Sequence, residues 1–168
     1  MTEICILYSI YKRDLTIYSI RKLITEKFGI YTKPSHGTIH PALKKLTSEG
    51  FVTVRETISE GGRKSCYYSV TEKGKKYLSK LILSDLSSNP SVFINDISIR
   101  TAALGVLSEN ERKQFIENTV KFLDLYEIQT KRAVENEYTG LDYYQKESFN
   151  QCLKSIADTK RFLCSLKV

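Results

Sequence analysis

One segment of the chain, residues 33–74, has an order of elements that few folds can accommodate. It starts with KPSHGTIHPALKKL at Lys33–Leu46, whose apolar residues have the spacing of a short helix. EGFVTVRETISEGGRKSCYYSVTEKG follows at Glu49–Gly74 and predicts two extended runs, a turn with glycines and cations between them, and the start of another helix. A helix followed by a two-stranded ribbon with a cationic turn is typical of a winged helix-turn-helix.

The positive charge of the chain is concentrated in the half that contains this segment. The 168 residues include 26 Lys+Arg and 19 Asp+Glu, for a formal net charge of +7. Residues 1–80 hold 15 basic and 7 acidic residues, whereas residues 81–168 hold 11 basic and 12 acidic residues. A mildly basic surface is common for solubility, but a one-sided basic excess attracts a polyanion and steers its approach. We therefore expect the N-terminal half to bind the phosphate backbone of DNA.

Composition otherwise indicates an ordinary globular protein. The apolar-leaning stretch Ile4–Tyr11 is too short to span a bilayer or to form a signal core, so we expect a cytoplasmic protein that does not enter membranes. His36 and His40 are one helical turn apart and could share a metal ion, but no nearby carboxylate completes a site. We predict no metal and no cofactor. Free thiols are expected for cysteines without CxxC spacing, which are Cys5, Cys66, Cys152 and Cys164.

The N-terminal part predicts three helices. Apolar residues recur at helical spacing in Glu3–Tyr11 and again in Leu15–Phe28, where Gly29 is well suited to end the helix in a left-handed conformation. Ser35 can cap a third helix. Pro41 lies inside that helix and removes one hydrogen bond, so we expect a bend or an irregular first turn. The apolar stripe of the third helix consists of Ile39, Leu43 and Leu46.

The ribbon is predicted from alternation of side chains. Phe51–Ile58 alternates in a way that suits a half-buried strand, and Ser65–Val70 supplies the return strand. Between them, Ser59–Lys64 has the sequence SEGGRK, whose two glycines permit positive φ. Thr71 is the expected N-cap of the next helix. Two cations at the turn are not needed for a hairpin, so they indicate a binding role.

The second half of the chain predicts a linker and long helices. Residues 84–92, SDLSSNPSV, are rich in serine, and we expect them to join a first domain at 1–83 to a helical domain at 93–168. Ser108–Glu111 is a capping box that opens a long helix, and a second amphipathic helix follows Thr139-Gly140. Two helices of roughly 25 residues joined by a tight turn form an antiparallel hairpin.

This hairpin carries an apolar stripe that the rest of the chain can cover only in part. A second copy of the chain would bury the stripe, and we predict dimerisation through it. The alternative is that the hairpin folds back on the N-terminal domain. The residues of the stripe are Phe115, Phe122, Tyr126, Phe149, Leu153, Ile156 and Leu163.

Two stretches carry a resemblance to a known family. GTIHPALKKLTSEGFV and GRKSCYYSVTEKG resemble the recognition helix, the wing return and the next helix start of the PadR family of bacterial transcription regulators. The resemblance covers about Leu15–Lys80, and the C-terminal hairpin matches only in kind. The chain has Thr16-Ile17-Tyr18 where the family usually has His-Gly-Tyr, and His40 where a tyrosine is commonest. The change at His40 bears on operator preference.

The resemblance implies a fold and a function. The fold is mainly α with a small β-ribbon, an N-terminal winged helix-turn-helix followed by a C-terminal helical hairpin for dimerisation. The implied function is that of a homodimeric repressor of transcription, which a small effector relieves in several members. Some members bind phenolic acids or flat aromatic drugs near the dimer interface, and no motif in this sequence marks such a pocket.

In a fold of this kind the third helix would enter the major groove with its N-terminus first, because the N–H groups of a helix start favour phosphate. Polar side chains of suitable length for bases or phosphates are Ser35, His36, Thr38 and His40. Cations suited to the DNA backbone or the adjacent minor groove are Lys33, Lys44, Arg63 and Lys64. Two such units on a dimer would bind double-stranded DNA at an inverted repeat with half-sites roughly 34 Å apart.

Other classes of function compete with this one. An enzyme is not expected, because the sequence has no Ser/His/Asp or Cys/His arrangement, no glycine-rich phosphate loop after a strand and no paired carboxylates. A winged helix can also be a protein-interaction module. That hypothesis predicts an apolar or acidic surface at Lys33–Lys44, but the residues of this segment are neither mainly apolar nor acidic. A winged-helix regulator of another family is a further alternative, which leaves DNA binding unchanged.

Overall fold

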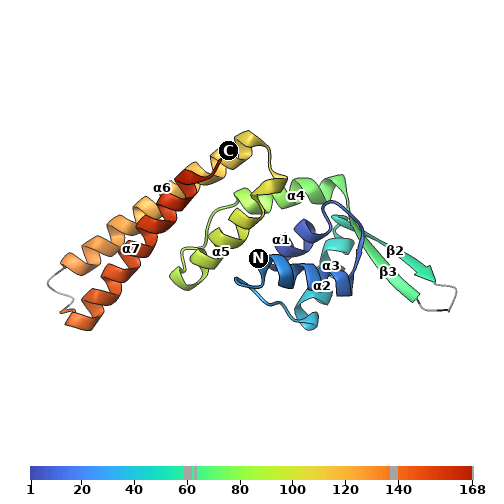
Figure 1. The fold of residues 1–168 in the computed structure, drawn as a ribbon, viewed down its shortest axis with the longest axis horizontal. Helices are drawn as coiled ribbons and strands as arrows, with labels where there is room; N and C mark the ends of the chain where they lie inside the picture. The colour runs from blue at the N-terminus through green and yellow to red at the C-terminus, as the bar shows by residue number, and fades with distance from the viewer. Residues whose placement is uncertain (59–61, 63, 137–139, 168) are drawn as a thin grey trace. The chain divides into compact units, whose positions relative to one another are not determined.

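A computed structural model of the chain describes residues 1–58, 62, 64–136 and 140–167. The fold is mainly helical and contains one small antiparallel sheet (Figure 1). The chain divides into two compact units, Met1–Leu107 and Ser108–Val168. The predicted fold class, helices with a β-ribbon in the N-terminal part and a helical hairpin in the C-terminal part, is confirmed.

The first unit is built around helix α1, which contacts the helices α2, α3, α4 and α5. Its elements in chain order are α1 (Thr2–Ser9), β1 (Leu15–Thr16), α2 (Ile17–Phe28), α3 (His36–Ser48), β2 (Val52–Ile58), β3 (Lys64–Val70), α4 (Glu72–Leu83), α5 (Pro90–Ala102) and the short 3-10 helix η1 (Leu104–Val106). Fully buried side chains in its core include Ile6, Leu7, Ile20, Ile24, Phe28, Ile39, Leu43, Leu46, Leu78 and Ile82.

The sheet has the strand order β1-β3-β2, with both pairs antiparallel. The short strand β1 was not expected, because Leu15 and Thr16 were predicted to start a helix. Instead, Thr16 is the N-cap of α2, and its side chain accepts a hydrogen bond from the Ser19 backbone N–H at 3.3 Å. An N-cap residue has extended backbone angles. Leu15 and Thr16 are therefore free to pair with Tyr68 and Tyr67 of β3.

Strands β2 and β3 form a ribbon that projects away from the helices (Figure 1). Val52 at its base is buried, but Val54 is 45% exposed and Ile58 is 67% exposed. The expectation of a half-buried β2 therefore holds at its first residue but not at Val54 or Ile58.

The predicted helix starts agree with the structure. Ser35 caps α3 by accepting from the Thr38 N–H at 3.2 Å, and Thr71 caps α4 by accepting from the Gly74 N–H at 3.0 Å. Ser108 forms the predicted capping box at the start of the second unit. Each cap satisfies backbone donors that the first helical turn would leave without partners.

Helix α5 belongs to the first unit, and the division between the units falls after Leu107 rather than within 84–92. One reason is the buried side chain of Arg100 on α5, which pairs with Asp96 at 2.7 Å. The same guanidinium also donates to backbone carbonyls at the C-terminal end of α4, those of Ile82, Ser84 and Asp85. Helix α5 thereby supplies partners that the last turn of α4 lacks.

The second unit is the predicted helical hairpin, formed by α6 (Glu109–Glu135) and α7 (Tyr143–Ser165), which lie side by side (Figure 1). Lys160 of α7 joins the two helices, because its ammonium lies 2.7 Å from carboxylate oxygens of both Asp124 and Glu127 of α6. Two lysines also hydrogen bond to Glu127, and these bonds lower the pKa of its carboxyl to about 2.

The residues predicted for dimerisation differ in exposure. Phe115, Ile156 and Leu163 are buried in the single chain. Those that are partly exposed are Phe122, Tyr126, Phe149 and Leu153. Apolar side chains that the prediction missed are more exposed than any of these, and they include Leu125, Ile128 and Phe162. Dimerisation itself stays a prediction.

Three simpler expectations concern membranes, metals and thiols. Within the part of the chain that the structure describes, every helix is too short or too polar to cross a membrane. The same described residues contain no cluster of three potential metal ligands. All four cysteines are free thiols.

Candidate nucleic-acid interface

Helix α3 has one buried side and one exposed polar side. Ile39, Leu43 and Leu46 are at most 1% exposed, as their spacing predicted. The exposed residues on or just before the helix include all of the predicted α3 site residues, namely Lys33, Ser35, His36, Thr38, His40 and Lys44. The helix is anchored through its apolar stripe, so that its polar side faces solvent.

The exposed residues of α3 lie in two rows. His36, His40 and Lys44 follow one another at intervals of one turn, and the rings of His36 and His40 stack with centroids 6.1 Å apart. Thr38 belongs to the other row, with Lys45, and faces a pocket behind the helix. The sequence prediction grouped Thr38 with the histidines, whereas in the structure Thr38 lines one pocket and His40 lines another.

The start of α3 is organised by two hydroxyl groups. Besides capping the helix, the Ser35 Oγ lies 3.0 Å from the Thr38 Oγ1, and one of these hydroxyls donates to the other. Each hydroxyl has one donor and two acceptor positions. The pair therefore retains one hydroxyl hydrogen for an external acceptor, so Ser35 and Thr38 can cap the helix and still contact a ligand.

Gly37 and Pro41 lie between the two rows. A Cβ atom at Gly37 would be 3.6 Å from the Ser35 Oγ, an ordinary contact, so packing does not require glycine there. The helix continues through Pro41, and the N–H groups of Thr38 and Ile39 both donate to the Ser35 carbonyl at 3.0 Å. With no long side chain at either position, the backbone of α3 is accessible along the middle of its exposed side.

The two adjacent lysines of α3 have different surroundings. Among the described residues, no carboxylate forms an ion pair with Lys44. The ammonium of Lys45 instead lies 2.9 Å from Glu3 of α1. Lys44 is therefore the cation of this helix that is available to an external anion.

The ribbon carries the remaining predicted residues. Lys64 is exposed at the start of β3, opposite Ile58. Arg63 lies outside the described residues, so its predicted role stays a prediction. An additional cation that the sequence analysis missed is Arg55, which is exposed and lies 5.8 Å from the ring centre of Tyr67 on the ribbon. Alternation along β2 places Arg55 on the face opposite Val54, and this pattern is the sequence signal that could have identified it.

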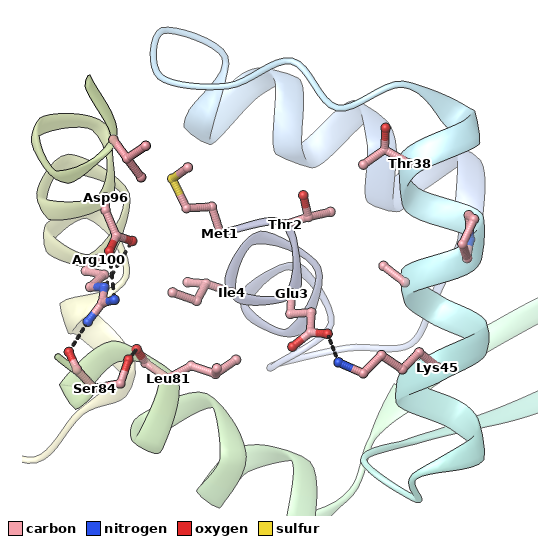
Figure 2. A pocket seen from close by; sticks show the side chains of 13 residues that line it. Met1, Thr2, Glu3, Ile4, Thr38, Lys45, Leu81, Ser84, Asp96 and Arg100 are labelled. Atoms are coloured by element: carbon pink, nitrogen blue, oxygen red, sulfur yellow. Dashed lines mark hydrogen bonds and ion pairs between the residues drawn. The ribbon is translucent and has the colours of Figure 1, made fainter. Parts of the chain in front are cut away.

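A pocket of about 650 Å³ lies behind α3 (Figure 2). Residues of α1, α3, α4 and α5 line it. Figure 2 shows two polar pairs on different walls, Glu3 with Lys45 and Asp96 with Arg100, and apolar side chains such as Ile4 and Leu81 between them. Since these four charged side chains are paired within the protein, they add little net charge to the pocket.

Residues 6–80 match the transcriptional regulator PadR-like family. The matched residues lie within the first unit, and the family is the one that the sequence resembles. The negative transcriptional regulator PadR of Bacillus subtilis (strain 168) is 28% identical over 110 residues, which cover 66% of this chain and 60% of that protein. The match thus spans about three fifths of the length of this PadR relative.

Solved structures of PadR proteins are also similar to this chain. Bacillus subtilis PadR in complex with operator DNA has 21% sequence identity and a TM-score of 0.49, covering 97% of this chain and 93% of that chain. The complex of the same PadR with p-coumaric acid has 20% identity and a TM-score of 0.44, covering 97% and 94%. The relatives named here are transcriptional regulators and not enzymes.

Proposed function

We propose that this protein is a sequence-specific DNA-binding regulator of transcription and that it acts as a homodimeric repressor. The observation that carries the proposal is the exposed polar side of α3, where His36, His40 and Lys44 form a row beside a projecting ribbon. A helix of this kind fits the major groove, and an adjacent ribbon can follow the DNA backbone. The match of residues 6–80 to the PadR-like family and the relation to a negative regulator support the same function.

In this function the residues divide by chemistry. Ser35, His36, Thr38 and His40 have donors and acceptors that suit base edges or phosphates, whereas Lys33 and Lys44 suit phosphates. Lys64, together with Arg63, would contact the adjacent minor groove or its phosphates. The surplus of basic residues in 1–80 supports a salt-dependent contribution to affinity, because bound cations release counterions from DNA.

The dimer is proposed to form through the helical hairpin. Leu125 of α6 and Phe162 of α7 are 63% and 51% exposed, and large apolar groups of this kind support an interface with a second copy. A two-fold dimer presents two α3 helices, and we expect it to bind an inverted repeat with half-sites roughly 34 Å apart.

A small effector is proposed to relieve repression. The pocket behind α3 supports this part, because α3 itself forms one wall and a ligand there would touch the helix that contacts DNA (Figure 2). An inducer must bind the free form of the protein more tightly than the DNA-bound form. A regulator that acts on chromosomal DNA would work in the cytoplasm of a bacterium.

The test is selection of bound fragments from a pool of random DNA, with gel filtration of the same protein sample. We expect enrichment of an inverted repeat and elution as a dimer. Binding that is weak and insensitive to sequence would contradict the proposal and would favour a protein-interaction module. Flat aromatic compounds added to the selected complex test induction, for which release of the DNA is the expected result.

A further inference from the structure

We propose that the groove between α3 and the ribbon holds one sugar-phosphate unit of the DNA backbone, with Lys44 and Tyr68 on the phosphate and Val54 on the sugar. This inference rests on the proposed function, and it adds two residues of the ribbon that neither the sequence prediction nor the family match assigns to DNA binding.

The groove is a defined feature of the first unit. It has a volume of about 340 Å³ and is open to solvent. One wall is the α3 surface at His40, Lys44, Thr47 and Ser48, and the other wall is Val54 and Tyr68. These two ribbon residues are direct partners across β2 and β3, so their side chains lie on the same face of the ribbon. The groove thus lies where α3, the helix proposed to enter the major groove, meets the ribbon.

The donors in this groove are free to act on a ligand. In the described part of the chain, the Tyr68 hydroxyl has no hydrogen-bond partner, and Lys44 has no ion-pair partner. Burial, with a smaller effect of Cys66, raises the pKa of Tyr68, so its hydroxyl remains protonated at neutral pH. The hydroxyls of Thr47 and Ser48 already donate to the carbonyls of Leu43 and Lys45 of their own helix. Lys44, Tyr68 and His40 therefore carry the available hydrogens.

The charge of the groove selects an anion. A cation and neutral donors line it, and none of the described residues in its lining is a carboxylate. Glu56 is the next residue of β2 on the same face, but it does not line the groove. Val54 is 45% exposed at the groove. A free inorganic anion would accept hydrogen bonds from the donors but would leave this apolar side chain exposed to water. A phosphodiester brings an apolar sugar edge next to each phosphate, which matches both parts of the lining.

The main experiment compares Tyr68→Phe with Tyr67→Phe on the operator that the selection yields. Tyr67 is the neighbouring residue of β3 and lies on the opposite face, so it receives the same chemical change outside the groove. Loss of a hydrogen bond to a charged group should weaken DNA binding roughly tenfold for Tyr68→Phe. Tyr67→Phe should bind as the wild type does. Thermal unfolding should be unchanged in Tyr68→Phe, because the missing hydroxyl has no partner within the described protein.

The phosphate itself can be identified by replacing each backbone phosphate of the operator in turn with an uncharged methylphosphonate. At one phosphate per half-site, the replacement should weaken binding of the wild-type protein. The same replacement should not weaken binding of Tyr68→Phe or Lys44→Met any further. If Tyr68→Phe binds every modified operator as the wild type does, the groove does not hold DNA. If the effects of Tyr68→Phe and Lys44→Met map to different phosphates, the shared site is wrong.

A second pair of variants keeps the test independent of the tyrosine. Val54→Glu places a negative charge in the groove, and Thr53→Glu places the same charge on the other face of β2, where Thr53 is also exposed. Binding should fall by more than tenfold for Val54→Glu and by much less for Thr53→Glu. Equal losses would overturn the inference. If the groove variants bind the operator as the wild type does, the groove inference is wrong and the proposed function stands. If the wild type binds no operator, both the inference and the proposed function are wrong.

Discussion

The ammonium of Lys45 on α3 lies 2.9 Å from the carboxylate of Glu3 on α1. The other oxygen of the same carboxylate accepts a hydrogen bond from the Tyr77 hydroxyl of α4, also at 2.9 Å. The Glu3 side chain of α1 thus contacts both α3 and α4, and α1 packs against each of these helices. Figure 2 shows its pair with Lys45. Lys44, the preceding residue, has no such partner among the described residues, which gives two adjacent lysines different predicted roles.

The first prediction separates these lysines by the salt dependence of operator binding. Lys45→Met should leave the slope of the logarithm of the binding constant against the logarithm of salt concentration nearly unchanged, because its charge is neutralised by Glu3. Lys44→Met should reduce the magnitude of that slope by about one, as expected for loss of one phosphate contact. Fluorescence anisotropy at several salt concentrations measures both. A reduction of about one for Lys45→Met would show that Lys45 leaves Glu3 to contact DNA.

The second prediction concerns acid and Glu3. Burial acts to raise the pKa of this carboxyl, but hydrogen bonds from Lys45 and Tyr77 outweigh it, and the pKa is lower than the ordinary value. A pKa that folding lowers adds stability above the unfolded-state pKa, and this stability is lost as pH falls through the folded-state pKa. Glu3→Gln should therefore reduce the free energy of unfolding by about 1 kcal/mol at pH 7. The difference from the wild type should vanish in strong acid.

Urea unfolding at pH 7 and at pH 3 measures this effect. Glu117→Gln is a matched control, because Glu117 is exposed and no ion pair involves it in the described structure. A Glu3→Gln difference that is as large at pH 3 as at pH 7 would mean that packing, and not charge, explains the loss.

The third prediction concerns Gly74 in the first turn of α4. A Cβ atom there would overlap the Phe51 carbonyl and would lie 2.8 Å from the Val70 Cγ2. The base of the ribbon and the start of α4 can approach only because this residue has no side chain. Gly74→Ala should destabilise the protein by about 1–3 kcal/mol, the usual range for an overpacked site. Gly105→Ala is the control, since nothing lies within 4 Å of its position and its φ is not positive.

Thermal unfolding distinguishes the two glycines. We expect a clearly lower midpoint for Gly74→Ala, and an unchanged or slightly higher midpoint for Gly105→Ala because alanine restricts the unfolded chain. Similar midpoints for both variants would contradict the close approach of α4 to Phe51.

Local patterns in the sequence were sufficient for several features of the fold. The spacing of Ile39, Leu43 and Leu46 predicted which side of α3 is buried, and Ser35, Thr71 and Ser108 predicted where helices begin. These features depend on residues within four positions of one another. An N-cap or an apolar stripe is set by the local geometry of the helix, so one segment contains the necessary information.

Features that depend on distant residues were missed or misplaced. Leu15 joins the sheet only because Tyr68, far along the chain, offers an edge to pair with. Helix α5 joins the first unit partly through Arg100, whose acceptors lie 15 to 18 residues away. Gly29 does follow the last residue of α2, but its φ of −62° is right-handed and not the expected left-handed end.

The candidate site shows the same division. Exposure of His36, His40 and Lys44 followed from the helix pattern, whereas the groove beside them depends on which residue of β3 faces Val54. The register of a hairpin depends on the length and type of its turn, and the sequence between the two strands is compatible with glycine-rich turns of several lengths. Tyr68 therefore could not be assigned to the groove before the pairing of the strands was known.

The last prediction tests the helical hairpin as the dimer interface. Leu125 is 63% exposed on α6, and Lys at this position would place a charge in any interface that covers it. Leu125→Lys should shift the protein from dimer to monomer, because an unpaired buried charge costs several kcal/mol in an interface. The variant should then bind a single half-site as the wild type does but bind the full inverted repeat much more weakly. Light scattering and half-site titration measure these two outcomes, and a dimer of unchanged stability would exclude this face of α6.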